Sequence, residues 1–190
     1  WEEGNRLNEL MTKAVEQANR AGEIIRRLRS FVAQGDTERN LDDIGDVVEE
    51  ACALALVGAH SDGIDTIINL APNLSEAMMD RIQIQQVMVN LIRNSLDATL
   101  AQENRSIAIG TLPGDDETVI AYVSDNGPGL APDIAERLFQ PFNSSKEDGM
   151  GIGLSISRTI IEQHGGRIWA TPNETDGVTF SFALPVETEN

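Results

Sequence analysis

Cysteine is nearly absent from this sequence, since Cys52 is the single one among 190 residues. A chain with one cysteine forms no internal disulfide, and this fits a reducing compartment. We expect Cys52 to be a small buried apolar residue. No apolar run approaches the ~18 residues of a membrane-spanning helix, and the first residues lack a charged-then-apolar export pattern. These absences predict a cytoplasmic chain that makes no membrane contact.

Basic residues are scarce beyond the first 30 positions. Those 30 residues carry six basic and five acidic side chains, whereas the other 160 carry eight basic and 26 acidic ones. Because a nucleic-acid backbone needs a basic surface, this acidic part excludes nucleic acid as a partner. If it binds a polyphosphate, a divalent cation and backbone N–H groups have to offset the repulsion.

Several catalytic and metal-binding motifs are also absent. The sequence has no Cys/His zinc pattern, no Gly-x-Ser-x-Gly nucleophile elbow and no P-loop. Its two histidines, His60 and His164, have no second ligand at a suitable spacing. His164, next to Gly165, is predicted to end a helix and face the negative end of the helix dipole. A nucleotide site here would therefore not be of the P-loop kind.

Two glycine clusters are the most informative motifs present. Residues 125–129 close a predicted strand, and residues 149–154 open a predicted helix. Glycines spaced by one residue let a backbone lie against a ligand, and a helix N-terminus offers N–H groups to an anion such as phosphate. Between the clusters, the polar segment 143–148 contains Lys146 and has the composition of a mobile lid over a phosphate.

Two asparagines lie on one face of a helix predicted over 80–102, with Asp80 as its N-cap. Asn90 and Asn94 are four residues apart, although asparagine is a poor residue inside a helix. They could be solvated amides, but a side-chain carbonyl oxygen also suits Mg²⁺ bound to substrate phosphates.

The first segment, residues 3–34, is predicted to be one long helix. Its apolar residues alternate spacings of four and three, as in a coiled-coil seam: Leu7, Met11, Ala14, Ala18, Ala21, Ile25, Leu28 and Val32. A seam this long predicts packing on another helix, as in a dimerising arm. The alternative is a helix that lies on its own domain.

The remaining elements follow from periodicity and turn residues. We predict further helices over 44–59, 131–138 and 151–164, and a possible short strand within 37–43. We predict three strand pairs: 64–70 with 77–79 as a hairpin, 106–112 with 118–124, and 167–171 with 177–184.

Taken in order, five motifs resemble those of the ATP-binding catalytic domain of sensor histidine kinases, in the superfamily that includes gyrase and MutL. They are an N box at 90–98, a glycine box at 125–129, an F box at 138–142, a second glycine box at 149–154 and a Gly-Thr-x-Phe-like element at 177–180. Residues 18–32 and 80–87 look closest to FixL-type kinases.

The resemblance implies a fold and a domain division. The fold is an α/β, two-layer sandwich of the Bergerat type, with a mixed sheet of about five strands after a long N-terminal coiled-coil-type helix. Residues 1–35 would be the second helix of a dimerisation and histidine-phosphotransfer hairpin. Residues 36–190 would be the ATP-binding catalytic domain.

The resemblance also implies the roles of individual residues. Asn94 would ligate Mg²⁺ and, with Lys146, serve catalysis, while Asp125 would accept a hydrogen bond from the adenine amine. Thr179 would lie at the inner edge of the base. The full ATP-binding set is Asn90, Asn94, Ala98, Asp125, Gly127, Gly129, Lys146, Gly149, Met150, Gly151, Ile152, Gly153, Leu154 and Thr179.

The sequence departs from the family pattern at three points. Asp97 replaces a lysine that many histidine kinases use on phosphate, so that contact is absent or passes to Arg93 or Lys146. Asn143 stands where relatives often have phenylalanine. The phosphoacceptor motif His-Glu/Asp-x-x-x-Pro is missing.

We therefore expect a kinase fragment that moves the γ-phosphoryl of Mg·ATP to a histidine outside this chain, for relay to a response-regulator aspartate. We also expect a homodimer through the N-terminal helix. The alternatives are a Ser/Thr-directed switch kinase or ATPase of the same superfamily, and a nucleotide-silent dimerisation and docking module.

Overall fold

The computed structural model describes residues 38–57, 63–115, 117–130, 137–140 and 152–186. The chain divides into two units, residues 1–37 and residues 38–190, and all the described residues belong to the second. The expected N-terminal helix and dimerising arm lie outside the described residues. So do most of the helix expected over 131–138, and Lys146, Gly149, Met150 and Gly151.

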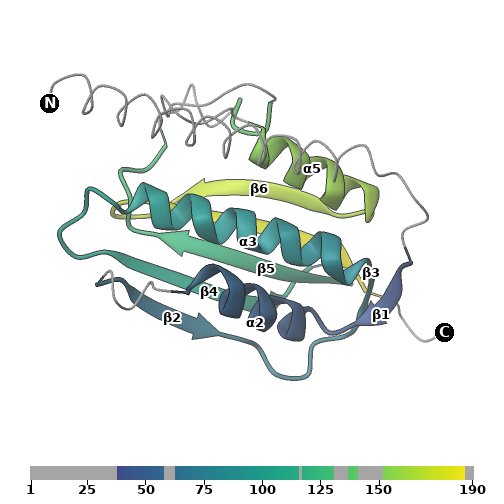
Figure 1. The fold of residues 1–190 in the computed structure, drawn as a ribbon. Coiled ribbons are helices and arrows are strands. Elements are labelled where there is room, and N and C mark those ends of the chain that lie inside the picture. Colours follow the sequence, from purple (N-terminus) through teal and green to yellow (C-terminus); the bar gives the residue numbers. More distant parts are fainter. Residues whose placement is uncertain (1–37, 58–62, 116, 131–136, 141–151, 187–190) are drawn as a thin grey trace, which may run out of the picture. The chain divides into compact units, whose positions relative to one another are not determined.

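A five-stranded mixed sheet forms the base of the described unit, in the order β2-β4-β5-β7-β6 (Figure 1). Strand β2 runs parallel to β4, and the other neighbours are antiparallel. The strands are β2 (Asp65–Asn69), β4 (Ser106–Pro113), β5 (Thr118–Asp125), β6 (Arg167–Pro172) and β7 (Val178–Pro185). The expected mixed sheet is confirmed, as are the antiparallel pairs β4–β5 and β6–β7.

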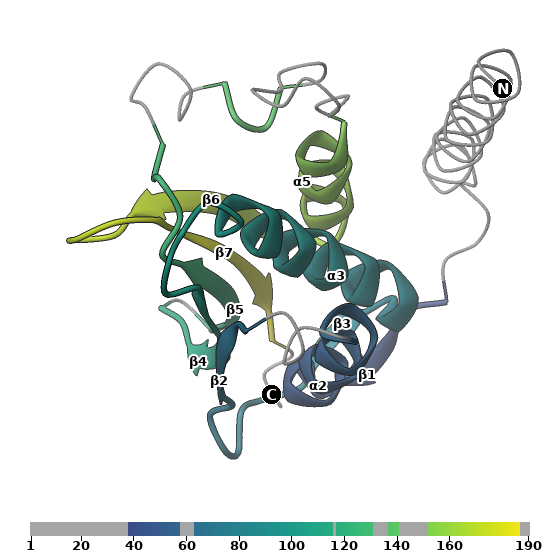
Figure 2. The same cartoon turned by 60° about the vertical axis from the view of Figure 1, so that its left-hand side comes forward.

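The helices of the described residues cover one face of this sheet (Figure 2). They are α2 (Ile44–Ala55), α3 (Arg81–Ala98) and α5 (Gly153–Gln163). Along β5, every second residue from Val119 to Asp125 is buried, as expected for a strand with one covered face. The described unit is therefore the expected two-layer α/β sandwich.

Aspartate side chains begin two of these helices. Asp80 accepts hydrogen bonds from the backbone N–H groups of Ile82 and Gln83 (3.0 and 3.1 Å), as predicted, and Asp43 accepts one from Gly45 (2.6 Å). Helix α3 ends at Ala98 and α2 at Ala55, earlier than predicted. No described helix has the length and apolar character needed to cross a membrane.

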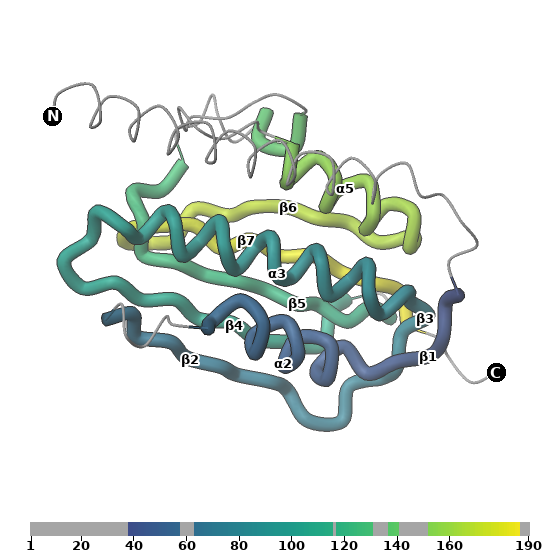
Figure 3. The backbone as a smooth tube through the Cα atoms, in the orientation of Figure 1, coloured from purple at the N-terminus to yellow at the C-terminus, as the bar shows by residue number. Residues whose placement is uncertain are grey.

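The predicted hairpin of residues 64–70 with 77–79 is wrong. Strand β2 pairs with β4, and β3 (Ala77–Met79) pairs antiparallel with β1 (Asn40–Asp42) in a separate two-stranded sheet. Ala77 and Met79 are fully buried. Because β3 pairs with β1 and not with β2, the chain leaves the edge of the main sheet after β2 instead of reversing beside it (Figure 3).

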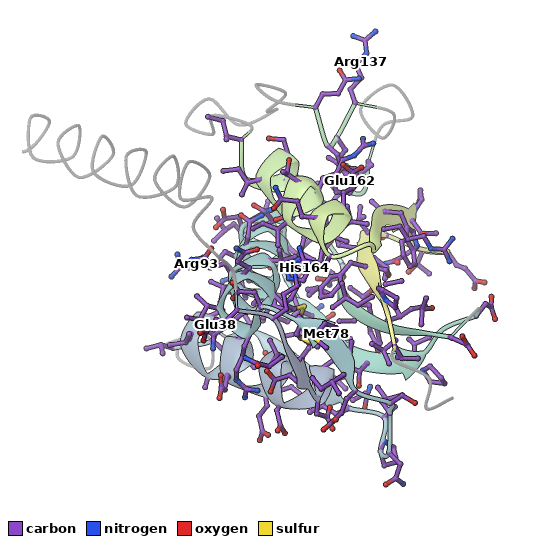
Figure 4. All side chains as sticks on the ribbon, turned by 90° about the vertical axis from the view of Figure 1, so that its right-hand side faces the viewer. Glu38, Met78, Arg93, Arg137, Glu162 and His164 are labelled. Atoms are coloured by element: carbon purple, nitrogen blue, oxygen red, sulfur yellow. The ribbon has the colours of Figure 1, made fainter. Side chains whose placement is uncertain are left out.

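Two single residues can be compared with their predictions. Cys52 is buried, as expected, and burial raises the pKa of its thiol to about 11. His164 ends α5 as predicted, but it is buried (Figure 4). Burial lowers the pKa of His164 below its usual value, against the opposing effect of its hydrogen bond to the Ile160 carbonyl. The ring faces the C-terminal carbonyls of α5, as predicted, since its Nδ1 lies 2.7 Å from the Ile160 carbonyl oxygen, and burial favours the neutral ring.

Candidate functional site

The site begins with the two asparagines of α3. Asn90 Nδ2 donates a hydrogen bond to Ser157 Oγ on α5 (3.0 Å). A Cβ added to Gly153 would lie 2.7 Å from Asn90 Oδ1, so glycine lets the start of α5 approach this side chain closely. Asn90 therefore connects α3 to the N-terminus of α5.

Helix α5 differs from α2 and α3 at its N-terminus. Its N-cap residue is Ile152, and no side-chain hydrogen bond caps the helix within the described residues. Its first turn contains Gly153 and Leu154, and the Ser155 hydroxyl bonds to the Ile152 carbonyl (2.8 Å) instead of a helix N–H group. The first N–H groups of α5 can therefore bind an anion.

Asn94 lies one helical turn after Asn90 and is half-buried. Among the described residues, no side chain or backbone group forms a hydrogen bond with its amide. The described residues also contain no cluster of three or more His, Cys, Asp or Glu side chains that could hold a metal ion by themselves. A cation here would need the Asn94 oxygen together with phosphate oxygens and water, which is the donor set that Mg²⁺ takes in nucleotide sites.

Asp125 ends β5 and is 5% exposed. Its Oδ1 accepts hydrogen bonds from the backbone N–H groups of Gly127 (3.0 Å) and Val178 (3.3 Å), and its Oδ2 accepts one from Ser95 Oγ (2.9 Å). These donors compensate for the burial of a carboxylate and fix its orientation.

Small residues bring the backbone close to Asp125. A Cβ on Gly127 would lie 3.0 Å from the Cβ of Ala98, so this loop packs against the end of α3. A Cβ on Gly177, which has a φ of +96°, would overlap the Asp125 carbonyl. Gly129 also has a positive φ, of +79°. Ala98, Asp125 and Gly127 thus form one end of the site.

Thr179 lies away from this end. It pairs with Ser124 on β5, and its hydroxyl lies 2.8 Å from Ser124 Oγ and 2.7 Å from Asn173 Oδ1. Because side chains alternate along a strand, Val178 and not Thr179 lies on the same face as Asp125. The structure therefore differs from the expected position of Thr179 at the inner edge of a base.

Sequence reasoning missed three residues of this region. Ser95 touches Asp125, Ser157 touches Asn90, and Asn173 donates to the Asp125 backbone carbonyl (2.8 Å). Ser95 could have been found, since it directly follows Asn94 in a helix whose next turn contains Ala98. Nothing local in the sequence indicates Ser157 or Asn173, because both contacts depend on tertiary packing.

A protein-family model described as "Histidine kinase-, DNA gyrase B-, and HSP90-like ATPase" matches residues 79–188. The sensor protein FixL of Bradyrhizobium diazoefficiens is 45% identical over 97% of this chain and 37% of its own length. The C4-dicarboxylate transport sensor protein DctS of Rhodobacter capsulatus is 35% identical over 96% and 28%. This chain therefore spans about a third of these curated relatives.

Two solved structures of a histidine kinase are also similar to this chain. The nucleotide-free catalytic domain of histidine kinase ThkA has a TM-score of 0.70 and 33% identity, with coverage of 78% of this chain and 96% of that one. ThkA in complex with the response regulator protein TrrA has a TM-score of 0.76 and 28% identity, with coverage of 91% and 49%. The similarity includes Asn90, Asn94 and Asp125, since all three lie within the matched residues 79–188.

Proposed function

Because this chain belongs to the histidine kinase-, DNA gyrase B- and HSP90-like ATPase family and carries the ATP-binding catalytic domain of a sensor histidine kinase, we propose that it binds Mg·ATP between α3, α5 and the end of β5. The observation that carries this proposal is the buried Asp125 carboxylate, held by three donors beside Gly127 and Ala98. An ionised carboxylate accepts hydrogen bonds and cannot donate them. It therefore suits the exocyclic amine of adenine and disfavours the carbonyl of guanine.

The start of α5 and Asn94 would bind the phosphates. Asn90 fixes the position of this helix end, and the first N–H groups of α5, which no described side chain caps, would donate to phosphate oxygens. Mg²⁺ held by the Asn94 oxygen would neutralise phosphate charge, which matters for a chain of net charge −17. We assign Lys146 and residues 149–151 to the same phosphates from the sequence resemblance.

The acceptor of the γ-phosphoryl group would be a histidine on another part of the protein, for relay to a response-regulator aspartate. The similarity to ThkA in its complex with TrrA supports a response-regulator partner. Residues 1–35 would form the second helix of the dimerisation hairpin and make the homodimer contact, and residues 36–190 would form the catalytic domain. The cytoplasmic location is likewise a proposal.

Calorimetry with Mg·ADP tests this assignment. We expect saturable binding by the chain at micromolar to submillimolar nucleotide and weaker binding after EDTA is added. Gln86→Ala, on an exposed position of α3, is the matched control and should bind as the parent does. Absence of binding up to millimolar Mg·ADP would overturn the proposal and favour a nucleotide-silent docking module.

A second experiment tests the chemistry. The chain is mixed with Mg·ATP and a supplied histidine-containing acceptor, and the phosphoprotein is treated with acid. Phosphohistidine should be lost in acid, whereas an acid-stable product would favour a Ser/Thr-directed kinase.

A further inference from the structure

Ser95 is the polar side chain of α3 that lies deepest against the sheet. It is fully buried, and its hydroxyl lies 2.9 Å from Asp125 Oδ2. A hydroxyl carries one proton, and an ionised carboxylate has none to give. The Ser95 proton therefore points at Asp125, and because the side chain is fully buried it can act on a ligand only through that carboxylate.

The hydrogen bonds of Asp125 leave one oxygen able to accept another donor. A carboxylate has about four lone-pair positions. Gly127 N–H and Val178 N–H fill both positions of Oδ1, whereas Oδ2 has Ser95 as its donor within the described residues. A ligand amine would therefore bind Oδ2.

Strand β7 supplies no side-chain hydroxyl to this face. Val178 is apolar and contacts Asp125 through its backbone N–H group. The hydroxyl of Thr179 lies on the other face, between Ser124 and Asn173. Among the described residues, Ser95 is therefore the hydroxyl-bearing side chain that bonds the Asp125 carboxylate.

We propose that Ser95 is a positioning residue for base specificity: its hydroxyl fixes the Asp125 carboxylate so that Oδ2 accepts a hydrogen bond from the 6-amino group of adenine. Because Ser95 is fully buried, it acts on the base through the carboxylate and does not touch the nucleotide. A 6-oxo purine presents a carbonyl oxygen at this position, which meets an acceptor and no donor.

This inference rests on the proposed binding of an adenine nucleotide at this site. Its test compares Mg·ADP with Mg·IDP by calorimetry on the whole chain. The two bases differ in the 6-amino or 6-oxo group and in the N1 proton that the 6-oxo base carries. We expect Ser95→Ala to weaken ADP binding about tenfold and IDP binding much less, so that the ratio of the two dissociation constants falls about tenfold.

Ser157→Ala is the matched control, because it removes another buried hydroxyl at the phosphate end. It should change ADP and IDP affinities by the same factor. If Ser95→Ala also changed both equally, Ser95 would have a packing role and the inference would be overturned. If the unsubstituted chain bound neither nucleotide, the proposed function itself would fail.

A second substitution, Ser95→Cys, tests the role of the hydroxyl even if the alanine variant does not fold. Ser95→Cys keeps the volume but has a weaker donor and acceptor. It should give an ADP to IDP ratio between those of the parent and Ser95→Ala, and circular dichroism should show an unchanged thermal transition. A ratio equal to that of the parent in both folded variants would contradict the role of the hydroxyl.

Discussion

The two ends of the proposed nucleotide site differ in how far the chain itself satisfies their polar groups. At the base end, the Asp125 carboxylate already accepts hydrogen bonds from Ser95, Gly127 and Val178. At the phosphate end, the Asn94 amide has no hydrogen-bond partner among the described residues, and no described side chain caps α5. On the proposed assignment, the base end would be organised before a nucleotide binds, whereas the phosphate end would need the nucleotide and its cation to complete its contacts.

The largest expected effect comes from changing the acceptor at the base end. Asp125→Asn keeps the shape of the side chain but replaces one oxygen by an NH₂ group. Since the backbone donors of Gly127 and Val178 need the remaining oxygen, the NH₂ group faces Ser95 and the adenine amine, donor against donor. ADP affinity should fall about 100-fold, or about 2.7 kcal/mol.

Calorimetry with Mg·ADP measures this loss. Asp65→Asn removes an equal charge at an exposed position on the edge strand β2 and is the control. If both variants lost affinity equally, the effect would be one of net charge, and the assignment of Asp125 to the base would be wrong.

The second prediction tests the phosphate end of the proposed site separately from the base end. Asn94→Ala removes an oxygen ligand of the proposed Mg²⁺ and leaves the Asp125 contacts in place. Affinity for ADP should fall tenfold or more with Mg²⁺ present and change little in EDTA. Phosphoryl transfer to a supplied acceptor should be lost. An equal loss of affinity with and without the metal would show that Asn94 acts on the nucleotide directly.

Local patterns in the sequence predicted the parts of the site that lie on one element. Asp80 caps α3, and Asn90 and Asn94 share a helix face, because capping and the period of 3.6 need no knowledge of the rest of the chain. The five-stranded sheet followed from the family resemblance.

Contacts between distant segments account for the errors. Strand β2 pairs with β4, across more than 30 residues, and no turn signal reveals a parallel partner. The face on which Thr179 lies depends on its register with Ser124, and a shift of one residue would reverse it. Ser95 was missed because a serine inside a helix usually bonds locally. The division of the chain at residue 35 and the roles of residues 141–151 stay predictions.

The third prediction concerns the C-terminal end of α5, where groups of other segments form hydrogen bonds, in contrast with its N-terminus, which no described side chain caps. His164 Nε2 accepts a hydrogen bond from the Asp80 backbone N–H (3.0 Å), and Arg39 donates to the Gln163 carbonyl (2.9 Å). Because burial lowers the pKa of His164 in the folded state, the unfolded chain binds a proton first as pH falls. The contribution of His164 is therefore complete above pH 6.5 and is lost progressively below it.

Urea unfolding at pH 7.5 and pH 5.5 measures this loss as a lower free energy of unfolding at pH 5.5. His164→Gln keeps an acceptor for Asp80 N–H and removes the titration, so its pH dependence should be smaller. Equal slopes for the two proteins would show that another group is responsible.

The smallest expected effect comes from Asn173, whose side chain hydrogen-bonds the backbone of Asp125. Asn173 donates to the Asp125 carbonyl and lies beside the Thr179 hydroxyl, but strand pairing between Ser124 and Thr179 holds the same two strands together. Asn173→Ala should therefore weaken Mg·ADP and Mg·IDP binding by the same factor, about threefold, since it moves the strand end and not one carboxylate oxygen. Glu174→Ala, at the exposed next position, should change neither. A loss for ADP alone would mean that Asn173 controls the orientation of Oδ2, so the fixed position of the carboxylate would depend on the β6–β7 turn as well as on α3.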